Sequence, residues 1–368
     1  MNTNDLFFQT DFPPDISLHG GNVEAECKAC GVDPAEVTDF SACLNPLGPP
    51  PSLDELLAQG VKLVSSYPDV RGSKAIAALA AAHGVGSDTL LLGNGATELL
   101  YLAVRHLHPE RTLVLGPAYS DLIRASVLAG SKVHAELASP AKLFHYDLAE
   151  IHDTGNYHLV IFSNPCNPTG ASIRPAEIME WAASNPETYF LIDEAFIDFV
   201  DRPRASLVGI NYKNIIVLKS FTKFFCVAGL RLGMLWGDAE LIGVLGARQE
   251  PWSVNSIAQH LAPLLYGEKG YIEATHALIR RERSFLVRSL TELGFRVFDS
   301  PANFLLLRIE ADNISAPELK RMLLMKKILV RDCSNICGLG ERFIRVAVRR
   351  RDENERLVQA IEDCGYNR

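Results

Sequence analysis

A lysine with a hydroxyl before it and an arginine after it is the first feature of this sequence that could do chemistry. Ser220, Lys223 and Arg231 lie in the stretch 220–233, whose other residues are uncharged and partly aromatic. A lysine in such surroundings loses solvation, so its ammonium form is disfavoured and a nucleophilic amine is available near neutral pH. The hydroxyl and the planar guanidinium could together hold a phosphate. We therefore predict a pyridoxal 5'-phosphate (PLP) site in which Lys223 forms the Schiff base. A solvated lysine at a strand end is the alternative.

A second candidate for phosphate binding is the segment Gly93-Asn94-Gly95-Ala96-Thr97-Glu98. It follows the apolar residues 90–92 and opens a helical pattern over 98–106. Glycines let a backbone approach an anion closely, and the start of a helix presents free N–H groups. We expect Gly95, Ala96 and Thr97 to contact the cofactor phosphate, although small residues before a helix can also serve only as a turn.

Three further polar residues follow apolar runs that read as strands. Asn167 lies in the segment 163–170, where two Asn-Pro steps impose extended or turn geometry. Asp193 follows the run 189–192, and a carboxylate there needs a partner, which a pyridinium N–H would supply. Tyr119 could stack on a cofactor ring. The alternatives are a proline-rich turn for Asn167, a helix cap for Asp193 and a core tyrosine for Tyr119.

Two arginines near the C-terminus are candidates for binding anionic groups of a substrate. Arg345 alternates with apolar residues over 342–349, as on a strand, and could bind a carboxylate in bidentate fashion. Arg331, in Val330-Arg331-Asp332-Cys333, could meet a second anion. A salt bridge within the protein is the alternative for each arginine.

The elements that must position these residues alternate between apolar, β-rich runs and helical patterns. Continuous apolar strands alternating with helices indicate a mainly parallel sheet covered on both faces, that is, an α/β fold. Ligands of such sheets bind beyond the carboxyl ends of the strands, where the candidate residues lie. The predicted strands are 112–115, 159–162, 189–192, 215–218 and 234–236.

After about residue 265 the pattern changes to that of a smaller α+β domain. It has a long helical pattern over 271–293, strands over 304–309 and 342–348, and a closing helix over 353–364. A chain of 368 residues exceeds what one core usually holds. We predict an N-terminal arm and part of the small domain over 1–48, a large PLP-binding domain over 49–265 and a small C-terminal domain over 266–368.

Composition argues against several classes of function. The net charge of −8 does not fit nucleic-acid binding, and no apolar run reaches the roughly 18 residues that span a membrane. The start of the chain lacks the features of a signal peptide, so we expect a cytoplasmic protein. Among the eight cysteines, Cys27 and Cys30 have CxxC spacing, but no second pair or histidine completes a metal set. We predict reduced thiols and no metal.

The order and spacing of these residues resemble those of fold-type I PLP enzymes, the aspartate aminotransferase superfamily, over nearly the whole chain. The resemblance implies a large domain with a mainly parallel seven-stranded sheet, and Asn167 on the ring hydroxyl oxygen. Tyr67 resembles the tyrosine that reaches the phosphate from the other subunit, which implies a homodimer with shared active sites. The residues implied to hold the cofactor are Lys223, Asp193, Asn167, Tyr119, Ser220, Arg231, Gly95, Ala96, Thr97 and Tyr67.

Within the superfamily, the chain is similar to histidinol-phosphate aminotransferases and, more closely, to threonine-phosphate decarboxylases of cobalamin biosynthesis. The similarity is carried by segments 19–22, 39–41, 45–50, 193–199 and 331–335. By resemblance, His19 and Arg331 would face the substrate phosphate and Arg345 its carboxylate. Asn45 is also implied to bind the substrate.

Two positions bear on the substrate. Phe196 stands where many aminotransferases have a tyrosine that donates to the ring oxygen, so Asn167 alone would serve that oxygen. The decarboxylases usually read Ser-Ala-Asn-x-Asn-Pro, but here Cys43 replaces the first asparagine of that pattern. This departure puts the identity of the substrate in question more than that of the cofactor.

The expected activity is the decarboxylation of a small phosphorylated amino acid, O-phospho-L-threonine, to (R)-1-aminopropan-2-yl phosphate. O-Phospho-L-serine is a close alternative substrate, because the two differ by one methyl group. An aminotransferase acting on histidinol phosphate is the alternative reaction. A non-catalytic relative that senses an effector is the remaining alternative, and the presence of Lys223 argues against it.

Overall fold

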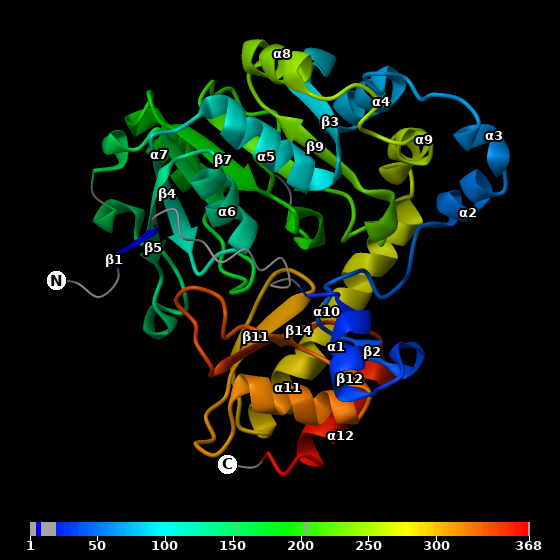
Figure 1. Ribbon diagram of the computed structural model, residues 1–368, viewed down its shortest axis with the longest axis vertical. Helices are drawn as coiled ribbons and strands as arrows, with labels where there is room; N and C mark the ends of the chain where they lie inside the picture. The colour runs from blue at the N-terminus through cyan, green and yellow to red at the C-terminus, as the bar shows by residue number, and fades with distance from the viewer. Residues whose placement is uncertain (1–4, 9–19, 152, 203–204, 367–368) are drawn as a thin grey trace.

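The computed structural model describes residues 5–8, 20–151, 153–202 and 205–366. Its main element is an eight-stranded sheet with the strand order β1-β5-β4-β6-β7-β8-β9-β3 (Figure 1). The strands are β1 (Asp5–Phe8), β3 (Leu90–Asn94), β4 (Arg111–Gly116), β5 (Lys132–Leu137), β6 (Leu159–Ser163), β7 (Tyr189–Asp193), β8 (Ile215–Ser220) and β9 (Leu232–Trp236).

Most of this sheet is parallel, as predicted. Strands β5, β4, β6, β7 and β8 are paired in parallel, and β9 is antiparallel to both of its neighbours, β8 and β3. These seven strands form the predicted α/β sheet, and β1 adds an eighth strand, antiparallel to β5, at one edge. Strands β3 and β5 were not among the predicted strands, because the prediction considered only continuous apolar runs between helical patterns. The sequence of β5, KVHAEL, alternates apolar and polar residues, which is the pattern of a strand with one face partly exposed.

Helices cover both faces of the large sheet. Alternate strand residues face opposite layers: Leu191 packs in the cluster of α5 (Gly95–Leu107), α6 (Ser120–Leu128) and α8 (Ala239–Arg248). Its neighbours Phe190 and Ile192 pack in the other cluster. That cluster includes α4 (Ser73–His83), α7 (Pro175–Ser184) and α9 (Ser256–Leu265). Burial on both faces explains why these strands read as continuous apolar runs.

The C-terminal part of the chain builds a second, antiparallel sheet in the order β10-β11-β14-β13. Helix α10 runs from the helices around the large sheet to this smaller unit (Figure 1). The predicted long helix, two strands and closing helix correspond to α10, β11, β14 and α12. The elements are α10 (Lys269–Glu292), β10 (Arg296–Phe298), β11 (Phe304–Arg308), α11 (Ala316–Met325), β13 (Arg331–Asp332), β14 (Phe343–Ala347) and α12 (Arg351–Glu362).

The N-terminal segment contacts the C-terminal unit. Helix α1 (Val23–Cys30) packs on α11, and β2 (Thr38–Asp39) pairs in parallel with β12 (Ile328–Leu329). Helices α2 (Pro51–Leu57) and α3 (Val61–Val64) then lead to the large sheet. Across the described ranges, none of the helices combines the length and apolar character that crossing a membrane requires. The domain boundaries given above stay predictions.

Candidate active site

The polar residues predicted from the strand ends meet at one edge of the large sheet. Ser163, Asp193 and Ser220 are the last residues of the adjacent strands β6, β7 and β8. A cavity of about 220 Å³ opens beside them. Its walls include Tyr119, Asn167, Asp193, Phe196, Lys223, Arg331, Arg345 and the segment Ser41–Leu44. Because parallel strands point their carboxyl ends the same way, residues far apart in the sequence share this edge.

Lys223 is half-buried in the cavity wall. Its Nζ lies 3.2 Å from Ser220 Oγ and 5.9 Å from the ring centroid of Phe196. Burial lowers the pKa of the Lys223 ammonium, nearby Arg231 lowers it further, and Asp193 opposes both effects. The environment therefore favours the neutral amine, as the sequence predicts.

Asp193 is buried at the end of β7, where two donors hold its carboxylate. Ser163 Oγ donates to Oδ2 at 3.1 Å, and the Ala195 N–H donates to Oδ1 at 3.0 Å. Burial raises the pKa of this carboxyl, while Lys223 and the two donors lower it. A further N–H donor from a bound ring would complete the stabilisation of the ionised form. Ser163 was not predicted as a site residue; its place at the end of the strand beside β7 was the available signal.

The first turn of α5 and the end of the Lys223 loop form a cradle. Gly95 has φ +79°, and a Cβ on it would lie 2.5 Å from Arg231 Nη2. A Cβ on Gly233 of β9 would lie 2.4 Å from the Ala96 backbone nitrogen. Thr97 belongs to the same first turn. These close approaches set an exposed guanidinium beside helical N–H groups, an arrangement suited to a phosphate.

Tyr119 lies at the cavity wall, directly before α6, with its ring fixed through its hydroxyl. Tyr119 Oη donates to Asp121 Oδ2 at 2.6 Å, and Tyr101 donates to the other oxygen of Asp121 at 2.9 Å. Burial, with the Asp121 charge, raises the pKa of the Tyr119 hydroxyl, so Tyr119 stays neutral. A neutral ring fixed in this way is suited to stacking on a planar ligand.

Arg345 crosses from the smaller sheet into the cavity. It is buried on β14; its Nη1 donates to Asn167 Oδ1, and its Nη2 donates to the Ser41 carbonyl oxygen at 2.6 Å. Its Nε is buried and has no hydrogen-bond partner among the residues that the structure describes. A buried donor without a partner is costly, so this atom points to a missing ligand or water.

Arg331 lines the same cavity from β13. It is half-buried, its Nη2 donates to Asn335 Oδ1 at 2.8 Å, and burial lowers the pKa of its guanidinium. The antiparallel pairing of β13 with β14 sets Arg331 opposite Arg345. The cavity thus combines an amine with two guanidinium groups. His19, predicted beside Arg331, lies outside the described residues.

Asn45 and Tyr67, two of the predicted residues, line neither the cavity nor the cradle within this chain. The Asn45 side chain is buried, and its amide donates to Phe224 O at 2.8 Å and to Thr275 Oγ1 at 2.7 Å. These partners give Asn45 a role in holding the chain around Lys223, and its substrate contact stays a prediction. Tyr67 is 82% exposed and packs on Trp252 with ring centroids 4.9 Å apart.

Comparisons with known proteins agree with this geometry. The model of the family "Aminotransferase class I and II" matches residues 38–361. The threonine-phosphate decarboxylase of Salmonella typhimurium is 32% identical over 94% of this chain and 96% of its own length. The bifunctional adenosylcobalamin biosynthesis protein CobDQ of Leptospira interrogans is 32% identical over 95% of this chain, which covers 41% of that protein.

Solved structures show the same fold. The histidinol-phosphate aminotransferase from Clostridium acetobutylicum has a TM-score of 0.83 and 30% identity, covering 89% of this chain and 99% of its own. The enzyme of that name from Sinorhizobium meliloti, solved in complex with PLP, has a TM-score of 0.83 and 20% identity, covering 96% of this chain and 98% of its own.

Proposed function

Because this chain belongs to the class I and II aminotransferase family, we propose that it is a PLP-dependent decarboxylase of a small phosphorylated amino acid. The proposed substrate is O-phospho-L-threonine and the product (R)-1-aminopropan-2-yl phosphate, as in cobalamin biosynthesis. The observation that carries the proposal is the presence of Arg331 and Arg345 in one small cavity with Lys223. A carboxylate and a phosphate on one short substrate would each meet a guanidinium there.

The family's cofactor is PLP, and the residues present fit it. The cradle of Gly95, Ala96 and Arg231 suits a phosphate, and a Cβ on Gly95 would close it. Ser220 Oγ adds a hydroxyl, which lies 2.7 Å from Thr222 Oγ1. When bound, PLP joins the substrate amino group and takes up the electron pair that the departing group leaves on Cα.

The chain's own groups would hold the ring and move the protons. Asp193, held by its two donors, would accept a hydrogen bond from the ring nitrogen and keep that nitrogen protonated. Asn167 would donate to the ring hydroxyl oxygen, which Phe196 cannot do. Lys223 Nζ, with its lowered pKa, would be the amine nucleophile that holds the cofactor, and its ammonium form would be the acid that returns a proton to Cα.

The substrate's two anions would be divided between the two arginines. The partnerless Nε of Arg345 is a donor available to the carboxylate, and Arg331 is the donor for the phosphate. Decarboxylation requires the Cα–carboxylate bond to stand out of the ring plane. A phosphate held by Arg331 would set the rotation about the Cα–N bond and thereby present the carboxylate as the leaving group.

Two alternatives use the same residues. O-Phosphoserine lacks one methyl group, and a pocket discriminates against it by about 1–3 kcal/mol only. Transamination of histidinol phosphate would remove a proton from Cα instead of carbon dioxide. The 30% identity and shared fold with the Clostridium enzyme support this second reaction.

A substrate panel separates these reactions. The purified holoenzyme is incubated with phosphothreonine, phosphoserine or histidinol phosphate, each with and without 2-oxoglutarate, and carbon dioxide and the amine products are measured. We expect carbon dioxide and 1-aminopropan-2-yl phosphate from phosphothreonine without any keto acid, and about tenfold lower kcat/KM for phosphoserine. Product formation that depends on 2-oxoglutarate and releases no carbon dioxide would establish the aminotransferase instead.

A further inference from the structure

One wall of the active-site cavity is a stretch of chain with no helix and little strand, residues 39–46, which we call the strap. It begins at the end of β2, and Ser41, Ala42, Cys43 and Leu44 line the cavity. Backbone hydrogen bonds hold its first residues: Asp39 pairs with Leu329, and Phe40 bonds to Leu329 and Ala347 at 2.7 and 2.9 Å. From Ser41 onward the backbone leaves this ladder, so its position depends on the groups that bond to it.

The strap contacts the residues proposed to bind substrate and cofactor. The Ser41 carbonyl oxygen accepts the hydrogen bond from Arg345 Nη2 at 2.6 Å. Further along, the Asn45 N–H donates to the carbonyl oxygen of Lys223 at 3.0 Å. Any shift of the strap near Ser41 would therefore move or release the Arg345 guanidinium.

The N-terminal end of the strap is folded around Asp39. Asp39 Oδ1 accepts from the Ser41 N–H at 2.7 Å, from Ser41 Oγ at 2.6 Å and from the Ala42 N–H at 3.3 Å. This turn makes the position of Ser41 follow that of Asp39. The Asp39 carbonyl oxygen in turn accepts a hydrogen bond from Arg349 Nη1 at 2.9 Å.

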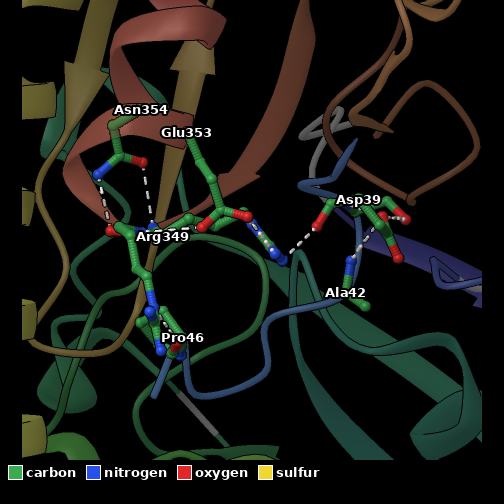
Figure 2. Close-up of polar contacts among 8 residues, drawn as sticks. Asp39, Ala42, Pro46, Arg349, Glu353 and Asn354 are labelled. Carbon is green, nitrogen blue, oxygen red and sulfur yellow. Dashed lines mark hydrogen bonds and ion pairs between the residues drawn. The ribbon is translucent and has the colours of Figure 1, made fainter. Parts of the chain in front are cut away.

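Arg349 is itself held from several sides, as Figure 2 shows. Glu353 Oε1 accepts from Arg349 Nε at 2.9 Å and from Nη2 at 2.5 Å, which turns the remaining nitrogen toward Asp39. The fully buried Asn354 bonds to the backbone N–H and carbonyl of Arg349, at 3.1 and 2.8 Å. The side chains of Arg349 and Glu353 are 25% and 19% exposed, so solvent weakens this pair only in part.

The other end of the strap is held by the same helix start. Arg350, directly before α12, donates through Nε to the Pro46 carbonyl oxygen at 2.8 Å (Figure 2). The start of α12 thus contacts both ends of the strap. Arg350 is exposed, whereas Arg349 is partly buried. Since an exposed contact is screened by water, the Arg349 contact is the stronger of the two.

We propose that Arg349, oriented by Glu353, is a positioning residue for substrate binding: it holds Asp39 and the strap so that Ser41 presents Arg345 to the substrate carboxylate. The proposal rests on the proposed function insofar as Arg345 binds that carboxylate. The proposed phosphate cradle and Asp193 belong to the large sheet and its helix α5, so Arg349 reaches the cofactor only indirectly, through the bond from Arg345 to Asn167 and the bond from the Asn45 N–H to the Lys223 carbonyl oxygen. A lysine cannot replace it, because an ammonium lacks the planar fork that reaches Glu353 and Asp39 together.

Arg349→Met and Arg349→Lys test this role. We expect KM for phosphothreonine to rise about tenfold in both variants, with kcat within about twofold of the wild type. The reason is that a misplaced Arg345 weakens binding of the substrate and of the transition state equally. PLP affinity should change much less than KM, because none of the described hydrogen bonds joins the strap to the phosphate cradle or to Asp193. Glu353→Gln keeps the guanidinium but weakens its orientation, so a smaller rise in KM is expected.

The matched control is Arg342→Met. Arg342 lies next to the opposite end of β14 and bonds to Asp312 at 2.9 Å. Within the described part of the chain it makes no hydrogen bond with the strap. It should leave KM unchanged. An unchanged KM in both Arg349 variants would overturn the proposal, as would an equal rise in Arg342→Met. If Arg349→Met does not fold, the Arg349→Lys variant decides by the same criteria.

A binding measurement keeps this inference separate from the proposed function. Phosphothreonine is mixed with the holoenzyme at several concentrations, and its Kd is read from the initial change in PLP absorption, before turnover consumes it. Tight binding without carbon dioxide release would refute the decarboxylase and leave the role of Arg349 testable through Kd. A Kd that is the same in wild type and Arg349→Met would refute the role of Arg349 whatever the reaction.

Discussion

Two adjacent acidic residues at the end of β7 are buried in different surroundings. Asp193 lines the cavity beside Lys223. Glu194 is buried away from the cavity lining, and its carboxylate accepts hydrogen bonds from the Leu207 N–H at 2.7 Å and from Ser206 Oγ at 2.5 Å. Burial raises the pKa of Glu194 to about 7, and the nearby Lys219 ammonium opposes this rise. Glu194 therefore ties Ser206 and Leu207 to the end of β7. Its carboxyl also stays protonated to a higher pH than an exposed carboxyl would.

Glu194→Gln should change how stability depends on pH. A carboxyl whose pKa in the folded state is raised stabilises the fold below its unfolded value, 4.5, and that stabilisation is lost as pH rises through about 7. Over this window the unfolding free energy of the wild type should fall relative to Glu194→Gln, by on the order of 3 kcal/mol. Urea unfolding at pH 5 and pH 8 measures the difference. The exposed Glu187→Gln is the control, and parallel pH curves for wild type and Glu194→Gln would contradict the prediction.

At the scale of elements, the start of α5 shows how helix and strand packing build the phosphate cradle. Gly233 of β9 allows the backbone of Ala96 to approach closely, and Gly95 allows the Arg231 guanidinium to do so. Both glycines stand where a side chain would collide with an atom of the site. The left-handed φ of Gly95 adds a backbone requirement to this steric one.

Gly95→Ala and Gly130→Ala separate the two requirements. Both glycines have left-handed φ angles, +79° and +85°, but a Cβ on Gly130 meets nothing within 4 Å. Each variant should lose about 1 kcal/mol of unfolding free energy from backbone strain. PLP affinity should fall, by about tenfold, in Gly95→Ala only, because its methyl displaces Arg231. Fluorescence titration with PLP measures this; equal affinities in the two variants would argue against the cradle.

At the scale of the whole molecule, many of the exposed large apolar side chains gather on one side. They lie on α2, α3 and α9 and on the loops that lead from α3 to α4 and from α8 to α9; α2 and α3 both pack on α9 (Figure 1), and Tyr67 packs on Trp252. The cluster consists of Leu57, Val61, Val64, Tyr67, Val70, Trp252 and Leu264. Exposed apolar side chains on elements that pack together are typical of an interface. We propose a homodimer that buries it and brings Tyr67 to the partner's phosphate cradle.

Val64→Glu should dissociate this dimer. Val64 is 62% exposed, and a carboxylate there would be buried without a partner on association. We expect a monomer in sedimentation velocity and at least tenfold lower activity, because Tyr67 no longer completes the partner's site. Leu128→Glu, at a residue that is 65% exposed on α6 outside the cluster, should stay dimeric and active. A fully active monomer would refute the shared site.

The sequence by itself determined the central strands of the large sheet and which polar residues lie at their ends. The apolar runs before Asp193 and Ser220 identify buried parallel strands, and the strand ends in such a sheet meet at one edge, so local signals are sufficient to group these residues with Lys223. A search for continuous apolar runs missed β5, whose alternating sequence is typical of a strand that is buried on one face only.

Only the tertiary structure decided which distant residues meet. The bonds from Arg345 to Asn167 and to Ser41, and from Arg349 to Asp39, join segments that no pattern of neighbouring residues relates. The partners of Asn45 are equally distant in the sequence: its side-chain amide donates hydrogen bonds to the Phe224 carbonyl oxygen and to Thr275 Oγ1. Hydrogen-bond partners that are distant in the sequence depend on how the two sheets pack against each other. That packing is a property of the whole chain, which local propensity and periodicity do not encode.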